Sequence, residues 1–220
     1  VGVRLLPGRV EQADTLQAAG GSMQSNGTLQ VSAGTAVLDD ASTVAERIDL
    51  KAGSLSNRNG EIIQTGDQAM QLDVAGVLDN SAGTVANSGD IEVASGELIN
   101  RGGTVGSTQG NVRVTASGAL DNSAGTLQAK QAVELASSGL NNQSGQVSAG
   151  TLKVDTGGQA LFNQDGLLLG DSVRIDSGAL NNQAGLIQSS GLLTVDTHGQ
   201  ALYNADSGTS NGLLGQAGIN

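Results

Sequence analysis

The chain has no cysteine and no tryptophan, and among its 220 residues there is one proline, one histidine, one phenylalanine and one tyrosine. With no thiol and a single imidazole, His198, it can build neither a Cys-His nucleophile nor a histidine-based metal site. His198 lies in the turn-like segment Asp196-Thr197-His198-Gly199, where a solvated side chain is expected. Large aromatic side chains usually dominate a globular core, so the interior of this protein must be filled by smaller residues.

Basic residues are also scarce: 10 Lys and Arg stand against 21 Asp and Glu, a formal charge of −11. This balance repels nucleic acid and anionic membrane surfaces, so no nucleic-acid partner is expected. Apolar runs such as Leu167-Leu168-Leu169 are far too short to span a bilayer. No run repeats the Gly-Gly-x-Gly-x-Asp pattern of calcium-binding β-helices, and we expect neither a metal nor a cofactor.

What the chain does contain is a phrase that recurs about every 21 residues: leucine, any residue, asparagine, then glycine three positions later. Seven clean copies begin at Leu55, Leu78, Leu98, Leu120, Leu140, Leu161 and Leu180. Looser copies begin at Leu16, Leu38 and Leu202, and in the copy at Leu38 we expect Asp40 to replace the asparagine. A fixed period of this length is typical of one supersecondary unit stacked on copies of itself.

Inside each unit the apolar residues alternate with polar ones, as in Val133-x-Leu135 and Leu152-x-Val154, and this period of two indicates strand. A second short strand surrounds residues such as Leu127, the Leu-x-Asn segment makes a third, and Gly, Ser, Asn, Asp and Thr fill the corners. The sequence therefore predicts an all-β protein, a parallel β-helix of about ten coils with three short strands in each. We expect residues 16–220 to form this array, residues 1–15 to be a flank or a partial preceding coil, and the whole to be a segment of a larger protein.

The asparagines of the phrase should lie one above another at the inter-strand spacing of about 4.8 Å. A primary amide both donates and accepts, so a column of amides can hydrogen-bond along the axis and satisfy a buried polar corner. We assign a structural role to this column, which comprises Asn57, Asn80, Asn100, Asn122, Asn142, Asn163, Asn182 and Asn204.

Three outward columns also follow from the same register. One runs between the two apolar positions of the third strand and reads Asp49, Gln71, Glu92, Arg113, Glu134, Lys153, Arg174, Thr194, with charges that alternate over its middle. Asp155, Asp176 and Asp196 form a column of like charges, which we expect turn hydrogen bonds rather than a metal ion to relieve. Phe162 and Tyr203 share a third column, with Asn181 between them, and are candidate surface contacts. Their rings could stack on a sugar or contact a partner, although we favour packing under a neighbouring long side chain.

The unit Gly-x-Leu-x-Asn-x-x-Gly-x-Val-x-Ala…Val-x-Leu resembles the repeats of filamentous haemagglutinin and of the exoproteins of contact-dependent growth inhibition. The resemblance covers about residues 16–208. It implies a right-handed parallel β-helix that forms the shaft of a protein exported by two-partner secretion to the surface of a Gram-negative bacterium. It also implies an outer-membrane transporter, engaged through regions outside this segment, and a receptor or glycan on a host or neighbouring cell.

Three functions remain to be weighed. A passive shaft of an adhesin or toxin carrier is the function we favour, and the alternative is an adhesive module that binds glycan or protein on an exposed strand face. Polysaccharide lyases and hydrolases also use parallel β-helices, but their sites need clustered carboxylates with Arg or Lys, supported by long loops. Here the repeat lengths vary only from 17 to 23 residues. We therefore expect no enzyme and no catalytic residue.

Overall fold

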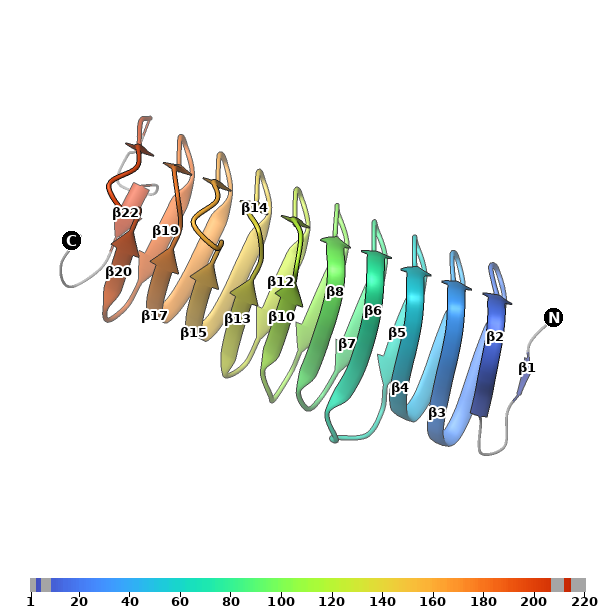
Figure 1. Ribbon diagram of the computed structural model, residues 1–220. Helices are drawn as coiled ribbons and strands as arrows, with labels where there is room; N and C mark the ends of the chain where they lie inside the picture. The colour runs from blue at the N-terminus through green and yellow to red at the C-terminus, as the bar shows by residue number, and fades with distance from the viewer. Residues whose placement is uncertain (1–2, 5–8, 207–211, 215–220) are drawn as a thin grey trace.

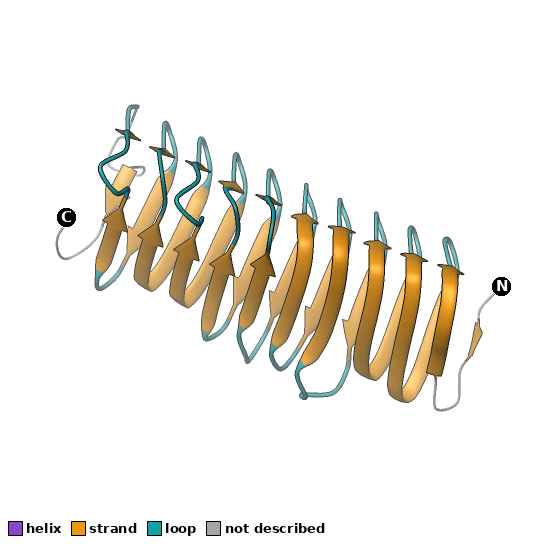
Figure 2. Cartoon of the chain, in the orientation of Figure 1, coloured by secondary structure: helices purple, strands orange, loops and turns teal. Residues whose placement is uncertain are grey.

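The computed structural model describes residues 3–4, 9–206 and 212–214, and the strands of this part stack into a single elongated solenoid (Figures 1 and 2). The described residues contain strands, turns and bends but no helix, and every paired strand is parallel to its neighbour. About ten turns, about 20 residues apart in the sequence, follow one another along the axis. The predicted fold class, an all-β parallel solenoid, is confirmed.

The strands range from 2 to 16 residues in length, and the two longest, β3 and β4, lie near the N-terminal end. The first half comprises β1 (Val3–Arg4), β2 (Arg9–Gln17), β3 (Ser22–Val37), β4 (Ser42–Ser56), β5 (Glu61–Gln64), β6 (Met70–Asp79), β7 (Thr84–Asn87), β8 (Ile91–Ile99), β9 (Thr104–Ser107) and β10 (Val112–Ala116). The second half comprises β11 (Leu120–Asp121), β12 (Thr126–Ala129), β13 (Ala132–Ala136), β14 (Leu140–Asn141), β15 (Gln146–Asp155), β16 (Leu161–Phe162), β17 (Leu167–Asp176), β18 (Leu180–Asn181), β19 (Leu186–Ser189), β20 (Leu193–Asp196), β21 (Leu202–Tyr203) and β22 (Gly212–Leu214).

A complete three-strand coil is seen in β11, β12 and β13. Elsewhere one strand continues around a corner, as in β3 and β4, which are 16 and 15 residues long. The expected three short strands therefore describe the sides of each coil, whereas several of its corners are passed without a break. At the N-terminal end, β1 and β2 both pair with β3 and so stack on the first full coil.

The register stacks like on like. Val112 pairs with Ile91 on one side and Val133 on the other, and Val114 pairs with Val93 and Leu135. Leu120 pairs with Leu98 and Leu140 in the same way. These columns fill the interior, where Val112, Val114 and Leu120 have no exposed surface. Stacked columns of apolar side chains thus replace the bulky aromatic core of a globular domain.

The register corrects one expectation about the second copy of the phrase. Leu16 pairs with Ala36, and Ala36 pairs with Leu55, so Ala36 rather than Leu38 begins this coil. Leu38 stands at the asparagine position, because its N–H donates to Ser56 as the Asn57 N–H donates to Asp79. The prediction that Asp40 replaces the asparagine is wrong. The start of this copy was misplaced because Leu38-Asp39-Asp40 resembles Leu-x-Asn in residue type. It lies two positions after the residue that begins the coil, Ala36.

Asp40 instead lies at the corner position where the backbone adopts the left-handed conformation. Its φ is 54°, and the equivalent residues of later coils, such as Asn59, Ala82 and Ala124, have φ of 52° to 53°. This conformation favours Gly, Asn and Asp, and an alanine there is strained. The corner shape is therefore kept even where the residue type disfavours it, which indicates that stacking on the neighbouring coils determines the turn.

Thr43 is an anomaly inside the same second coil. It pairs with Met23 and Ile62 in an apolar column, has no exposed surface, and its hydroxyl has no hydrogen-bond partner. A buried hydroxyl without a partner destabilises the folded state, because it loses its bonds to water and gains none in exchange.

We therefore expect Thr43→Val, which keeps the shape and removes the hydroxyl, to raise the free energy of unfolding by about 1 kcal/mol. The measurement is a denaturant titration followed by circular dichroism. Thr126→Val is the control, since Thr126 lies at an outward strand position with part of its surface exposed, and it should change stability little. An unchanged or lower stability of Thr43→Val would contradict the assignment.

Candidate functional site

The eight asparagines of the phrase form a continuous amide ladder at one corner of the solenoid. The side-chain Nδ2 of each of the first seven donates to the Oδ1 of the asparagine in the following coil, at 2.6 to 2.8 Å. Asn57 through Asn182 are fully buried. Steps along the ladder span 19 to 23 residues, so coils of unequal length keep the same corner.

Each amide also braces its own turn. The Nδ2 of Asn122 lies 3.2 Å from the carbonyl oxygen of Gly125, three residues on, and the same contact recurs along the column. Gly125 is required for a steric reason rather than for its φ. A Cβ there would overlap the backbone oxygen of Asn100 and lie 2.7 Å from Oδ1 of Asn122. The Asn and Gly of the phrase are therefore one device, in which glycine lets the previous coil approach closely enough for the amides to bond.

The ladder ends abruptly at its N-terminal side. Because Leu38 holds the asparagine position of the preceding coil, Oδ1 of Asn57 is buried without a donor. At the other end Asn204 accepts from Asn182 at 2.8 Å and is partly exposed. Every oxygen and nitrogen between these ends is engaged by the protein itself, so the column acts as internal scaffolding rather than as a ligand site.

The predicted charge column is present in the register. Arg113 pairs with Glu92 and Glu134, and Glu134 pairs with Lys153. Within the described residues one ion pair forms along it, between Nη2 of Arg113 and Glu134 at 2.9 Å, and Gln71 donates to Glu92 at 2.7 Å. Both members of the ion pair are substantially exposed, so it contributes little to stability.

Turn hydrogen bonds, as predicted, relieve two of the three carboxylates of the acidic column, and a histidine contacts the third. Asp155 and Asp196 each accept from the backbone N–H two residues on, at 2.8 Å. Asp176 lies between them in the column. Its Oδ1 is 2.6 Å from Nε2 of His198, which belongs to the following coil. Among the described residues, no cluster of three or more Asp, Glu or His side chains could hold a metal ion. Sequence reasoning placed His198 in a turn but missed this contact, because the partner lies 22 residues away.

The two aromatic rings lie on the outside, at the column position predicted for them. Phe162 pairs with Asn141 and Asn181, and Asn181 pairs with Tyr203. Phe162 is 44% exposed and Tyr203 is 62% exposed. They are the largest side chains of the chain and both face solvent, which is unusual for aromatic residues in a folded protein.

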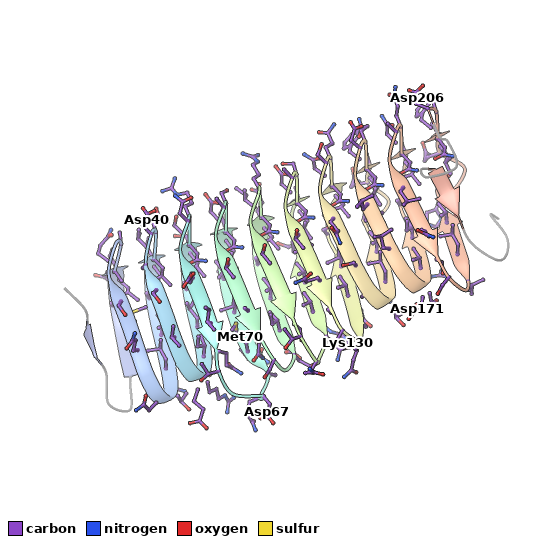
Figure 3. All side chains as sticks on the ribbon, turned by 180° about the vertical axis from the view of Figure 1, so that it is seen from behind. Asp40, Asp67, Met70, Lys130, Asp171 and Asp206 are labelled. Atoms are coloured by element: carbon purple, nitrogen blue, oxygen red, sulfur yellow. The ribbon has the colours of Figure 1, made fainter. Side chains whose placement is uncertain are left out.

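Concave surface is shallow in the described part of the chain. One open depression of about 500 Å³ lies at the edge opposite the asparagine corner and is lined by Ser107, Gln128, Lys130, Ser148 and Asp171 among others. Figure 3 labels Lys130 and Asp171 at this edge, and Asp40 and Asp206 at the other. With coils of nearly uniform length no long loop builds walls around it, so the arrangement offers surface rather than an enclosed reaction chamber.

The haemagglutinin repeat family model matches residues 8–82, 65–124, 108–195 and 147–219, which together cover nearly the whole chain. The chain belongs to the haemagglutinin repeat family. Comparison with curated proteins and with solved structures gives no match. Within the described part of the chain there is no helix with the length and hydropathy needed to cross a membrane.

Membership of the haemagglutinin repeat family agrees with the structure described above. The family is of a structural, non-enzymatic kind and is typical of secreted or cell-surface filamentous adhesins. The haemagglutinin repeats here form a filament segment whose buried polar groups bond mainly to one another.

The ladder makes its middle and its N-terminal end respond differently to the same substitution. Asn122→Leu leaves Oδ1 of Asn142 without a donor and removes the acceptor at 2.7 Å from Nδ2 of Asn100. Asn57→Leu leaves Oδ1 of Asn80 without a donor but removes an oxygen that already lacks one. We expect Asn122→Leu to lower the free energy of unfolding by about 2 kcal/mol more than Asn57→Leu.

Denaturant titration of the two variants measures this difference directly. Leucine is introduced in both, and Leu38 shows that the corner accommodates it. Equal losses of stability would show that the hydrogen bond that Asn122 accepts from Asn100 contributes nothing to stability.

His198 should titrate abnormally. Its pKa is raised above the ordinary 6.5 by the hydrogen bond to Asp176 and by the charges of Asp196 and Asp176. Because the folded pKa is the higher one, the stabilisation is complete below pH 6.5 and is lost as pH rises through the raised value. Since the chain has one histidine, one imidazole resonance in an NMR titration reports this pKa.

Asp176→Asn should bring the pKa of His198 down toward 6.5, because it replaces the negatively charged acceptor by a neutral one. Asp73→Asn, which affects a carboxylate paired with Lys51 in a distant coil, should leave it unchanged. An imidazole pKa that does not respond to Asp176→Asn would rule out the contact.

Proposed function

We propose that this segment is a shaft of a large secreted exoprotein at the bacterial surface, an adhesin or a carrier of a contact-dependent inhibition toxin. The observation that supports it most is the unbroken amide ladder, which ties eight successive coils at one corner whatever their length. Each coil adds about 4.8 Å of length. The function of such a segment is to provide length, because it holds a distal binding or toxin region away from the cell.

The composition also suits export. With no cysteine, no disulfide can form before the chain crosses a membrane. Coil contacts link residues about 20 apart, so folding can start at one coil and propagate along the array as the chain emerges. We propose passage through an outer-membrane transporter by two-partner secretion, engaged by regions outside this segment.

A second candidate is that the segment itself adheres. The exposed Phe162 and Tyr203, in one outward column, favour it, because rings without burial contribute little to folding and are available to a host or neighbouring-cell receptor or glycan. In this case attachment would depend on particular side chains rather than on length.

Deletion of whole and partial coils separates the two candidates. Removing Leu120 through Gly139 joins Ala119 to Leu140, which occupies the column of Leu120, so we expect a folded and slightly shorter rod. Removing Leu120 through Ala129 misaligns the apolar columns beyond the cut and should abolish folding. Leu135→Asp, which buries a charge, should also disrupt several coils, whereas the exposed Gln143→Ala should have little effect.

The measurements are display of the parent protein at the cell surface and attachment to target cells. The shaft role expects attachment to follow display and to survive the whole-coil deletion. If that deletion is displayed normally yet abolishes attachment, and a coil added elsewhere does not restore it, the segment contains a specific contact and the shaft role alone is wrong.

A further inference from the structure

The outward column of Asn141, Phe162, Asn181 and Tyr203 alternates amides and aromatic rings on four successive coils. At the inter-strand spacing the two rings lie two coils apart, roughly 9–10 Å. Each ring therefore has an amide on the neighbouring coil, and the set runs parallel to the axis of the rod rather than across it.

The two amides are each held by a hydrogen bond within their own turn. Oδ1 of Asn141 accepts the backbone N–H of Gln143, and Oδ1 of Asn181 accepts that of Gln183, both at 3.1 Å. This fixes the plane of each amide, and among the described residues no protein acceptor is recorded for either Nδ2. Both residues are partly exposed, so two N–H₂ donors are available beside the rings.

The four residues of the column are themselves uncharged, and the first carboxylate beyond them is Asp121, which pairs with Asn141. Ala160, Ala179 and Ala201 form the adjacent rank of residues, since their carbonyl oxygens accept from the backbone N–H groups of Leu140, Leu161 and Leu180 in the preceding coils. The column carries carboxylates only in earlier coils, at Asp79 and Asp121. A ligand lying here meets apolar ring faces and neutral donors, so charge complementarity favours a neutral molecule.

We propose that this column binds a linear, uncharged polysaccharide with equatorial β-1,4 linkages, lying along the rod. Sugar rings stack on Phe162 and Tyr203, and hydroxyl oxygens accept from Nδ2 of Asn141 and Asn181. The coil spacing of about 4.8 Å is close to the rise of one pyranose residue in an extended chain of this kind. A stable protein interface needs about 800 Å² on each partner, and a strip one residue wide fits a single glycan chain better.

This inference rests on the second candidate function, direct adhesion, and specifies its ligand class. The chain provides its own reporter, since Tyr203 is the single tyrosine and there is no tryptophan. Fluorescence of the purified chain, excited in the tyrosine band, therefore reports this column alone. The probes are cellohexaose and chitohexaose, with maltohexaose as the α-linked comparison and an oligogalacturonate as the anionic one.

We expect saturable changes in Tyr203 emission, and protection from acrylamide quenching, with the two β-linked neutral probes and not with the other two. Phe162→Ala should weaken binding about tenfold. Asn181→Asp keeps the acceptor of the turn, as Asp121 does for Ser123, but removes the donor, and should weaken binding several-fold. Ile99→Ala, an apolar residue of the same column flanked by Asp79 and Asp121, should bind as the parent does.

The absence of a saturable change with either β-linked probe, or equal affinity of Phe162→Ala and the parent chain, would overturn the proposal. So would equal binding of maltohexaose. Attachment of whole cells distinguishes a failure of the glycan proposal from a failure of direct adhesion. If Phe162→Ala abolishes attachment while no oligosaccharide binds, the column contacts a protein, and direct adhesion stands without the glycan. If attachment is also unaffected, both fail and the shaft role is untouched.

Discussion

Every coil of this protein must fit the coil before it and the coil after it at the same positions. The need to stack similar residues at equivalent positions of successive coils determines the structure more than any local propensity does. The amide ladder is its strictest form. The Nδ2 of each asparagine bonds to an asparagine of the following coil, and its Oδ1 accepts from an asparagine of the preceding coil. Gly125 and its equivalents obey the same rule, since the backbone of the preceding coil occupies the space of a side chain. The interior therefore repeats closely, while outward positions vary freely.

The sequence was informative where this requirement acts on side-chain type. The period, the strand alternation, the Asn corner and the outward position of Phe162 could all be read from residue spacing, because each is repeated many times. The second coil could not, since three departures coincide there: Ala36 replaces leucine, Leu38 replaces asparagine and Thr43 replaces an apolar residue. With several columns altered at once, residue type alone misplaced its beginning by two positions.

Contacts between side chains of different coils were also beyond the sequence. The alternation of charges predicted the column of Arg113 and Glu134, but which neighbours form an ion pair depends on rotamers and exposure. The contact of His198 with Asp176 joins a turn of one coil to the preceding coil, 22 residues away, and residue spacing alone does not show which side chains meet there. Regular features follow from periodicity, whereas pairings on the surface follow from geometry that a single copy of the repeat does not determine.

The ladder also gives the rod an electrical direction. Backbone groups donate both ways along the axis, for the N–H of Asn57 bonds to the following coil and that of Glu61 to the preceding one. The side-chain amides all donate toward the C-terminal coil. Their dipoles therefore add along the column, as peptide dipoles add in a helix, with the positive end toward Asn204 and the negative end at the bare oxygen of Asn57. Since aligned hydrogen bonds polarise one another, the two ends of the column are chemically different. A further coil could extend it at Asn57 only by bringing a donor, and at Asn204 only by bringing an acceptor.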